Sequence, residues 1–156
     1  MKTLLLLVGK TQNKHFIVGI NDYAERIGHY MPFEIKVIPE LRNTKNLSEQ
    51  QQKTQEGELL LKQLQPSDTV VLLDERGTEH RSVEFADWLQ KKQNTARRLV
   101  FIIGGPYGFS EAIYKRANEM VSLSRMTFSH QMVRLVFTEQ IYRACTIIKG
   151  EPYHHE

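Results

Sequence analysis

The stretch LVFIIGGPYGFS, residues 99–110, decides the fold of this chain. Residues 99–103 are apolar without interruption, which is typical of a short strand buried on both faces of a parallel sheet. Three glycines and a proline follow within residues 104–108, and they form a stiff loop whose backbone another molecule can approach closely. Ser110 has the character of a helix N-cap. A buried strand followed by a glycine loop and a helix predicts a ligand crevice at the carboxyl edge of a sheet.

The glycine loop, residues 104–108, does not match the two common phosphate-binding motifs. Its sequence GGPYG lacks the G-x-G-x-x-G spacing of dinucleotide-binding folds. No Gly-Lys-Ser or Gly-Lys-Thr follows it, as a P-loop would require. A tight turn that binds nothing is therefore the alternative that the loop by itself leaves open.

Strand and helix patterns alternate along the rest of the chain. Expected strands cover 4–8, 33–37, 69–73 and 99–103, with a short one from Met120, and expected helices cover 13–28, 48–65, 83–92, 111–118 and 130–149. Ser48 with Gln51 has capping-box spacing, and Ser82 is a candidate N-cap. Asp74 and Glu75 are expected in a solvated turn after the third strand. The alternation predicts a single α/β domain over residues 1–156, with a mostly parallel sheet of about five strands and helices on both faces.

The composition is that of an ordinary globular protein. Of the 156 residues, 40% are hydrophobic and 25% charged, and the net charge is +3. This mild positive charge permits an RNA partner without requiring one. Cys145 is the only cysteine, which excludes a disulfide framework. The apolar run at residues 4–8 is too short for a signal peptide or a membrane span, so we expect a soluble, cytoplasmic protein.

Histidine, arginine and tyrosine near the end of the chain are candidates for chemistry. His130 precedes the last helix, where it could cap the helix or accept a proton, and its distance from His154 and His155 argues against a metal site. Arg143 has the spacing for an ion pair with Glu139 within the helix, or it could hold a phosphate or a base. Tyr153 and His154 suit stacking on an extruded base, although most chain ends have no such role.

Four segments together resemble a known family. They are LVFIIGGPYG at 99–108, SLSRMT at 122–127, HQMVRLVFTEQIYRA at 130–144 and PYH at 152–154. The chain resembles the RlmH family, which are small bacterial methyltransferases of the SPOUT class. The resemblance covers essentially the whole chain, and the run from His130 to the terminal PYH is far more specific than the glycines.

The resemblance implies a fold, a cofactor and a reaction. The C-terminal part of the sheet would thread a trefoil knot, and the enzyme would work as a homodimer. The reaction would be methylation at N3 of a pseudouridine in large-subunit (23S) ribosomal RNA, in the assembled ribosome, without a metal. S-adenosyl-L-methionine would bind against Leu73, Gly104, Gly105, Leu123, Ser124, Arg125, Met126, Thr127 and Phe128.

The same resemblance implies roles for four further residues. His130 and His154 are the hypothesised proton acceptors, because N3 of pseudouridine must lose its proton before it attacks a methyl group. Arg143 would steady negative charge or a phosphate, and Tyr153 would position the base. His155 has no assigned role. Two alternatives stay open, namely a related knotted enzyme with another target in transfer or ribosomal RNA, and a ribosome-binding factor without turnover.

Overall fold

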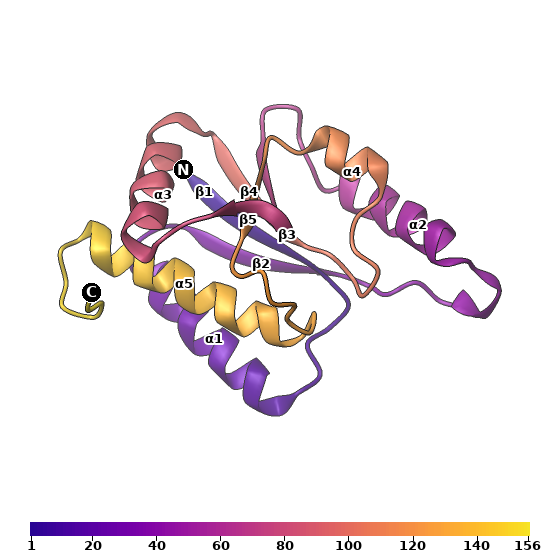
Figure 1. Ribbon diagram of the computed structural model, residues 1–156, viewed down its shortest axis with the longest axis horizontal. Helices are drawn as coiled ribbons and strands as arrows, with labels where there is room; N and C mark the ends of the chain where they lie inside the picture. Colours follow the sequence, from indigo (N-terminus) through magenta and orange to yellow (C-terminus); the bar gives the residue numbers. More distant parts are fainter.

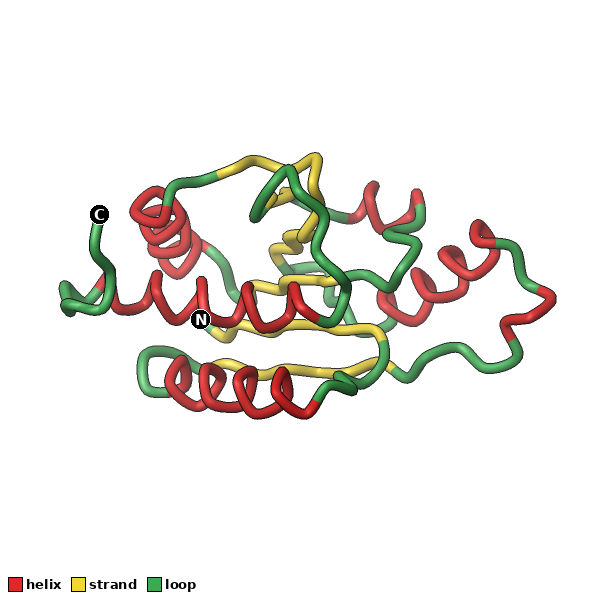
Figure 2. Tube along the Cα trace, turned by 60° about the horizontal axis from the view of Figure 1, so that its bottom comes forward, coloured by secondary structure: helices red, strands yellow, loops and turns green.

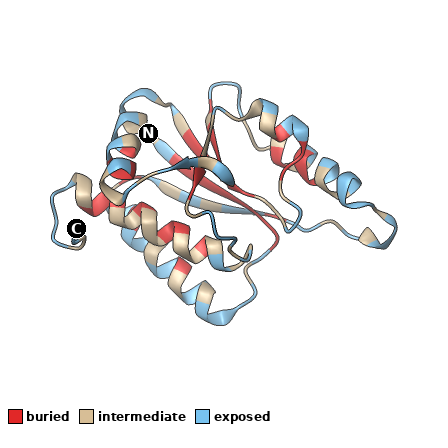
Figure 3. Cartoon of the chain, viewed as in Figure 1, coloured by how far each residue is buried: buried red, intermediate tan, exposed pale blue.

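A parallel sheet forms the centre of the molecule, as the alternating pattern predicts (Figure 1). In the computed structural model, which describes all 156 residues, its five strands have the order β2-β1-β4-β3-β5 and every neighbouring pair is parallel. The strands are β1 (Lys2–Val8), β2 (Phe33–Ile38), β3 (Thr69–Glu79), β4 (Arg98–Ile103) and β5 (Glu119–Ser122). The stretch that opens at residue 99 supplies the central strand β4, which is buried from Leu99 to Ile103 (Figure 3).

Helices cover both faces of the sheet and make a three-layer arrangement. One face packs against α1 (Lys14–Gly28), α3 (Ser82–Thr95) and α5 (Met132–Ile148), and the other against α2 (Glu49–Leu61) and α4 (Glu111–Arg116). A short 3-10 turn, η1 (Thr44–Asn46), precedes α2. Figure 2 shows that α2 and the segment before it extend beyond the sheet, away from the C-terminus. None of these helices has the length and apolar content needed to cross a bilayer.

Two helix starts follow the capping chemistry predicted from the sequence, and two do not. The capping box of Ser48 and Gln51 is present, and the hydroxyl of Ser110 accepts a hydrogen bond from the backbone N–H of Ile113 at 3.4 Å. Ser82 is not an N-cap, so that prediction is wrong. Ser82 is the first residue of α3, because Glu84 accepts the backbone N–H of Arg81 at 2.7 Å and caps the helix one residue earlier. The last helix begins at Met132, whose backbone N–H donates to the hydroxyl of Ser129 at 3.0 Å, so His130 does not cap it.

The predicted turn after residue 73 is also wrong, and the difference shapes the site. β3 continues to Glu79, and its register with β5 shifts between Leu73 and Thr78, so the intervening residues form a bulge. Gly77 permits this close pairing, since a β-carbon there would lie 2.6 Å from the backbone of β5. Asp74 is consequently not solvated, and its side chain is only 10% exposed.

A fully buried arginine ties the first strand to the last helix. The side chain of Arg134 has 0% exposure, and no carboxylate pairs with it. Burial lowers the pKa of its guanidinium. Its N–H groups donate instead to oxygen atoms at the end of β1 and before α5, namely the carbonyls of Val8 (2.7 Å), Gly9 (2.8 Å) and His130 (3.1 Å) and the hydroxyl of Thr11 (2.9 Å). The start of α5 is thereby fixed at the carboxyl edge of the sheet.

Candidate functional site

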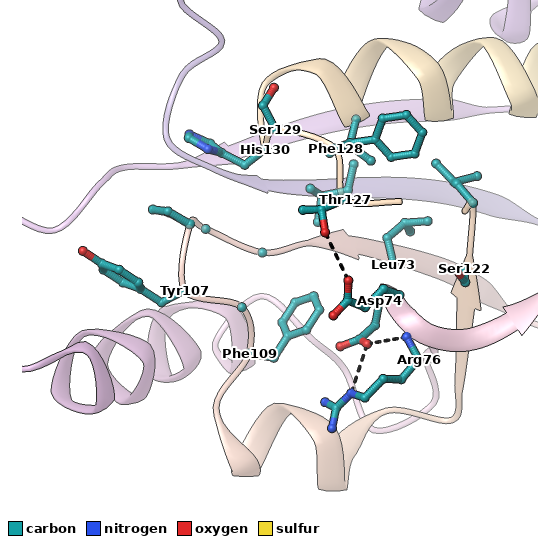
Figure 4. A pocket seen from close by; sticks show the side chains of 18 of the residues that line it. Leu73, Asp74, Arg76, Tyr107, Phe109, Ser122, Thr127, Phe128, Ser129 and His130 are labelled. Atoms are coloured by element: carbon teal, nitrogen blue, oxygen red, sulfur yellow. Dashed lines mark hydrogen bonds and ion pairs between the residues drawn. The ribbon is translucent and has the colours of Figure 1, made fainter. Parts of the chain in front are cut away.

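A cavity of about 1010 Å³ opens at the carboxyl edge of the sheet, where β3, β4 and β5 meet (Figure 4). This volume lies at the upper end of the range for small-molecule sites. Of the residues predicted from the sequence, those that line it are Leu73, Gly104, Gly105, Leu123, Ser124, Met126, Thr127, Phe128 and His130. Arg125 is not among them, because its side chain pairs with Glu79 at 2.9 Å and is 90% exposed.

The glycine loop forms one wall of the cavity with its backbone. Gly108 has a φ of +83°, and its N–H donates to the carbonyl of Gly105 at 3.1 Å, which closes a tight turn. Gly105 faces Glu56 of α2, whose carboxylate oxygen lies 2.8 Å from the place of a β-carbon. Phe109 packs similarly against Gly104, at 3.1 Å from such an atom. The loop is therefore held from behind, and its backbone is left to face the cavity.

Asp74 is the functional candidate that the sequence analysis placed in solvent. Its carboxylate accepts a hydrogen bond from the hydroxyl of Tyr114 at 2.5 Å. It also accepts hydrogen bonds from the backbone and side-chain N–H groups of Arg76 at 2.9 and 3.3 Å (Figure 4). Burial acts to raise the pKa of Asp74, but these hydrogen bonds outweigh it and hold that pKa below its usual range. The cavity thus carries an ionised carboxylate in a fixed orientation. An aspartate directly after a buried strand is the signal that could have identified it.

The segment after β5 has its own hydrogen-bond framework. The hydroxyl of Ser122 donates to the carbonyl of Ser124 at 3.0 Å, and the backbone N–H of Met126 donates to the hydroxyl of Ser124 at 3.0 Å. Thr127 donates to the carboxylate of Glu75 at 3.3 Å, which links this segment to the bulge of β3. These contacts shape the wall opposite the glycine loop. Figure 4 shows Leu73 and Ser122 at one side of the cavity and Tyr107 and His130 at the other.

Ionisable side chains of both signs line the cavity. The carboxylates are Asp74, Glu75 and Glu111, and the cations are Lys53 and Arg76, so negative charge exceeds positive charge by one. The ring of His130 makes no hydrogen bond with another residue of the chain. No group of three or more His, Cys, Asp or Glu side chains is arranged to hold a metal ion. The charge balance favours a ligand that carries positive charge.

The remaining predicted residues form a second group, the tail cluster, which consists of Glu139, Arg143, Tyr153 and His154. Arg143 donates to the carboxylate of Glu139 at 2.7 Å and to Nδ1 of His154 at 3.0 Å, and Tyr153 donates to the same carboxylate at 2.9 Å. The guanidinium of Arg143 also lies 4.9 Å from the ring centre of Tyr153. Burial and the hydrogen bond to Glu139 both raise the pKa of Tyr153. Its hydroxyl is therefore a donor and not an acid at neutral pH.

The contacts of His154 fix its tautomer. Arginine can only donate, so Nδ1 of His154 accepts from Arg143 and the ring proton is on Nε2. Nε2 lies 3.2 Å from Oε1 of Glu156, and the other carboxylate oxygen of Glu156 lies 2.5 Å from Arg81. In this arrangement His154 has no free nitrogen lone pair. It is a hydrogen-bond donor through Nε2.

The cavity and the tail cluster are at opposite ends of α5. His130 and Arg143 are thirteen residues apart in the sequence, which corresponds to about 20 Å along a helix. Figure 1 shows the C-terminus beside the last turn of α5, far from the first turn. Of the four residues predicted to act in catalysis, the fold brings His130 to the cavity and leaves Arg143, Tyr153 and His154 together elsewhere.

A family model and several similar sequences agree on the family, and a solved structure shares the fold. A family model described as predicted SPOUT methyltransferase matches residues 1–154. Proteins named ribosomal RNA large subunit methyltransferase H are similar over 100% of both chains, with 62% identity in Bacteroides thetaiotaomicron and 63% in Phocaeicola vulgatus. A probable methyltransferase from Bordetella pertussis shares the fold, with a TM-score of 0.55 and 12% identity over 92% of this chain and 96% of that one.

Proposed function

We propose, from the premise that this chain belongs to the RlmH family of SPOUT methyltransferases, that it methylates N3 of a pseudouridine in the 23S RNA of the assembled ribosome. The methyl donor in this proposal is S-adenosyl-L-methionine. The observation that carries the proposal is the cavity at the carboxyl edge, which combines apolar walls, a backbone-lined glycine loop and a fixed carboxylate. We infer the reaction from family membership, and we assign it to the cavity.

The residues of the cavity fit the donor chemically. The side chains of Leu73, Ile103 and Val121 offer apolar surface to a flat adenine ring. The carboxylate of Asp74 retains acceptor capacity for a ribose hydroxyl, and its charge favours a cationic ligand. When bound, the donor supplies an electrophilic methyl group on a sulfonium. The volume of about 1010 Å³ leaves room for a target base beside it.

His130 is the proton acceptor in this proposal. N3 of the base would lose its proton to a ring nitrogen of His130, and its lone pair would then form the bond to the methyl carbon. The methyl–sulfur bond would break with its electron pair remaining on sulfur, so that S-adenosylhomocysteine leaves. His130 lines the cavity with no hydrogen bond from its ring, whereas both ring nitrogens of His154 are engaged. The Nε2–H group of His154 and the guanidinium of Arg143 instead donate hydrogen bonds to the deprotonated, negatively charged base. Tyr153 positions the ring of that base. Alignment of the two reactants supplies much of the rate enhancement.

We propose that two copies of the chain combine to form each site. The cavity and the tail cluster are about 20 Å apart along α5, so one copy cannot bring both to the same base. Apolar side chains exposed around the cavity and on the neighbouring helices support an interface between copies. They are Ile17, Val18, Tyr107, Met126 and Met132, with exposures of 36%, 70%, 44%, 79% and 38%.

The remaining parts of the proposal concern topology, domain and location. We propose that the segment 122–128 is threaded as the trefoil knot of the SPOUT class, which would hold the wall of the cavity rigidly. Both hydrophobic clusters pack on the same sheet, and residues 1–156 therefore act as one catalytic domain. A cytoplasmic location follows from the ribosomal substrate.

The test is transfer of labelled methyl from S-adenosylmethionine to assembled ribosomes, free large subunits and bulk transfer RNA. The ribosomes come from a strain that lacks this enzyme, so that the target position is unmodified. We expect label on a pseudouridine of large-subunit RNA, mainly in assembled ribosomes. Label only in transfer RNA would overturn the substrate, and binding of the donor without any transfer would indicate a ribosome-binding factor instead of an enzyme.

A further inference from the structure

Positive side chains without an ion-pair partner occur at both edges of the sheet, including Lys62, Arg97 and Lys149 at the amino edge, and more of them lie at the carboxyl edge. At the amino edge of the sheet, Lys2 pairs with Glu34, Lys92 with Glu119 and Arg98 with Asp68. At the carboxyl edge, several exposed cations have no carboxylate within ion-pair distance, although Arg76 and Arg125 are paired there. The unpaired cations at that edge are the exposed Lys10, Lys14, Arg42 and Lys45 and the half-buried Lys53.

Three of these cations belong to one projecting segment, which we call the α2 arm and define as residues 41–55. The arm contains three cations and one carboxylate, Glu49, so its net charge is +2. It includes η1 and the outer half of α2, which extends beyond the sheet in two views (Figures 1 and 2). Figure 3 shows this outer half as largely exposed. Because α2 covers the face opposite α1 and α5, a second copy on those helices would leave the arm accessible.

We propose that the α2 arm is a docking surface for RNA phosphates beside the methyl-transfer site, an inference that rests on the proposed function. Gln50 and Lys53 of the arm line the mouth of the cavity, so a strand bound along the arm continues toward the reacting base. Neutral polar side chains dominate the rest of the arm, and such side chains commonly contact phosphate and sugar oxygens. Four of them, Gln50, Gln51, Thr54 and Gln55, also line a groove of about 560 Å³, together with Leu41, Leu59 and Glu58.

The composition of the arm favours RNA over a protein partner. Residues 41–55 contain no aromatic residue, and Leu41 and Leu47 are their only apolar side chains. Protein–protein contacts draw most of their energy from buried aromatic and arginine anchors, which this surface does not offer apart from Arg42. Unpaired cations among amides and hydroxyls are what a phosphate backbone requires.

The arm is also connected rigidly to the glycine loop. Glu56 and Gly57 follow the arm directly in α2 and are buried. Glu56 packs against Gly105, and a β-carbon on Gly57 would lie 2.3 Å from the hydroxyl oxygen of Ser110, where α4 begins. A phosphate held by Lys53 therefore stands at a fixed position relative to the cavity. This contact would orient the RNA in addition to binding it.

The test compares two double variants that each remove two exposed, unpaired cations. Arg42→Gln/Lys45→Gln changes the arm, and Lys62→Gln/Arg97→Gln changes the amino edge. Binding to unmodified assembled ribosomes is measured with S-adenosylhomocysteine present, over a series of salt concentrations. We expect the arm variant to bind about 5–20-fold more weakly and its log–log salt slope to fall by about 1–2, as for the loss of one or two phosphate contacts. The amino-edge variant keeps the wild-type slope.

Equal slopes for the two variants would overturn the docking surface. A photo-crosslinker attached at position 45 through Lys45→Cys gives an independent readout, with labelled ribosomal RNA expected and labelled ribosomal protein contradicting the proposal. The two proposals fail separately. If the wild-type protein methylates the ribosomes and the arm variant binds them as tightly as the wild type does, only the docking surface is refuted. If the wild-type protein binds the ribosomes more tightly than the arm variant does but never methylates them, only the proposed reaction is refuted.

Discussion

The two ends of α5 use arginine in opposite ways. At the first turn, Arg134 is fully buried and the hydrogen bonds of its guanidinium go to four oxygen atoms of the chain, three of them backbone carbonyls. At the last turns, Arg143 keeps 25% of its side chain exposed and contacts only the side chains of Glu139, His154 and Tyr153. Backbone carbonyls cannot move away, whereas side chains can exchange partners. The cavity end is thus built for a fixed shape, and the tail end for contacts that a substrate can replace.

The largest effect is expected when the tail cluster at the end of α5 is disrupted. Deleting residues 153–156 removes Tyr153 and His154 but no part of the cavity. We expect methyl transfer to fall below detection, while the Kd for S-adenosylhomocysteine stays within about twofold of wild type. Single-turnover transfer and calorimetry measure the two quantities. Arg81→Ala is the control, because it removes only the exposed contact to Glu156, and unchanged transfer by the deletion would refute a catalytic tail.

Exchanging each arginine of α5 for methionine sharpens the comparison. Arg134→Met leaves the carbonyls of Val8 and Gly9 without donors in the interior. We expect the free energy of unfolding to fall by about 3 kcal/mol and Tm by about 6–12 °C. Arg143→Met should cost less than about 1 kcal/mol, since its ion pair is partly exposed. If thermal unfolding shows similar decreases in the free energy of unfolding for the two variants, the two ends of α5 do not differ in their contribution to stability.

Asp74→Asn tests whether the charge of the carboxylate at the rigid, cavity end contributes to binding of the methyl donor. The substitution keeps the shape of the side chain and removes the charge that Tyr114 and Arg76 hold in place. We expect the affinity for S-adenosylmethionine to fall about tenfold, or about 1.4 kcal/mol. Isothermal calorimetry measures it, with Glu25→Gln as the control because Glu25 is exposed and does not line the cavity. Equal affinities for the Asp74 variant and the wild type would remove Asp74 from the donor site.

The smallest effect concerns the carboxylate behind the glycine loop. Burial raises the pKa of Glu56, so the unfolded chain gives up this proton at lower pH than the folded protein does. The free energy of unfolding therefore decreases as pH rises from the usual glutamate pKa to the raised one. Glu56→Gln removes that decrease, and we expect Tm at neutral pH to rise by about 2–4 °C. Glu58→Gln, which changes an exposed neighbour, should leave Tm and its pH dependence unchanged.

Most of the fold could be predicted from the sequence because its signals are local. The apolar runs at 4–8, 69–73 and 99–103 are strands in the structure, and the Ser48 capping box opens α2. The continuation of β3 could not be found in this way. Residues 74–77 carry the composition of a turn, and only pairing with β5, more than forty residues later, keeps them in the strand.

Nine of the residues singled out from the sequence line the cavity, but their arrangement relative to the other candidates could not be predicted. Asp74 was predicted to be solvated because its partner Tyr114 is forty residues away, and no local sequence pattern indicates such a contact. The separation of His130 from Arg143, by contrast, was present in the sequence, since thirteen residues of one helix span about 20 Å. The hydrogen bonds that fix the His154 tautomer depend on the fold of the tail and have no sequence signature.

The contact between Arg134 and the end of β1 has a consequence for biosynthesis. It joins residues that are 125 and 126 positions apart, and the first strand lies inside the sheet between β2 and β4. Contacts of such sequence separation form late and fold slowly. On a translating ribosome, the carbonyl groups at the end of β1 would lack the hydrogen bonds from Arg134 until α5 has left the exit tunnel. Under the proposed function, the protein would then have no complete cavity while it is still a nascent chain, and it would first methylate ribosomes other than the one that made it.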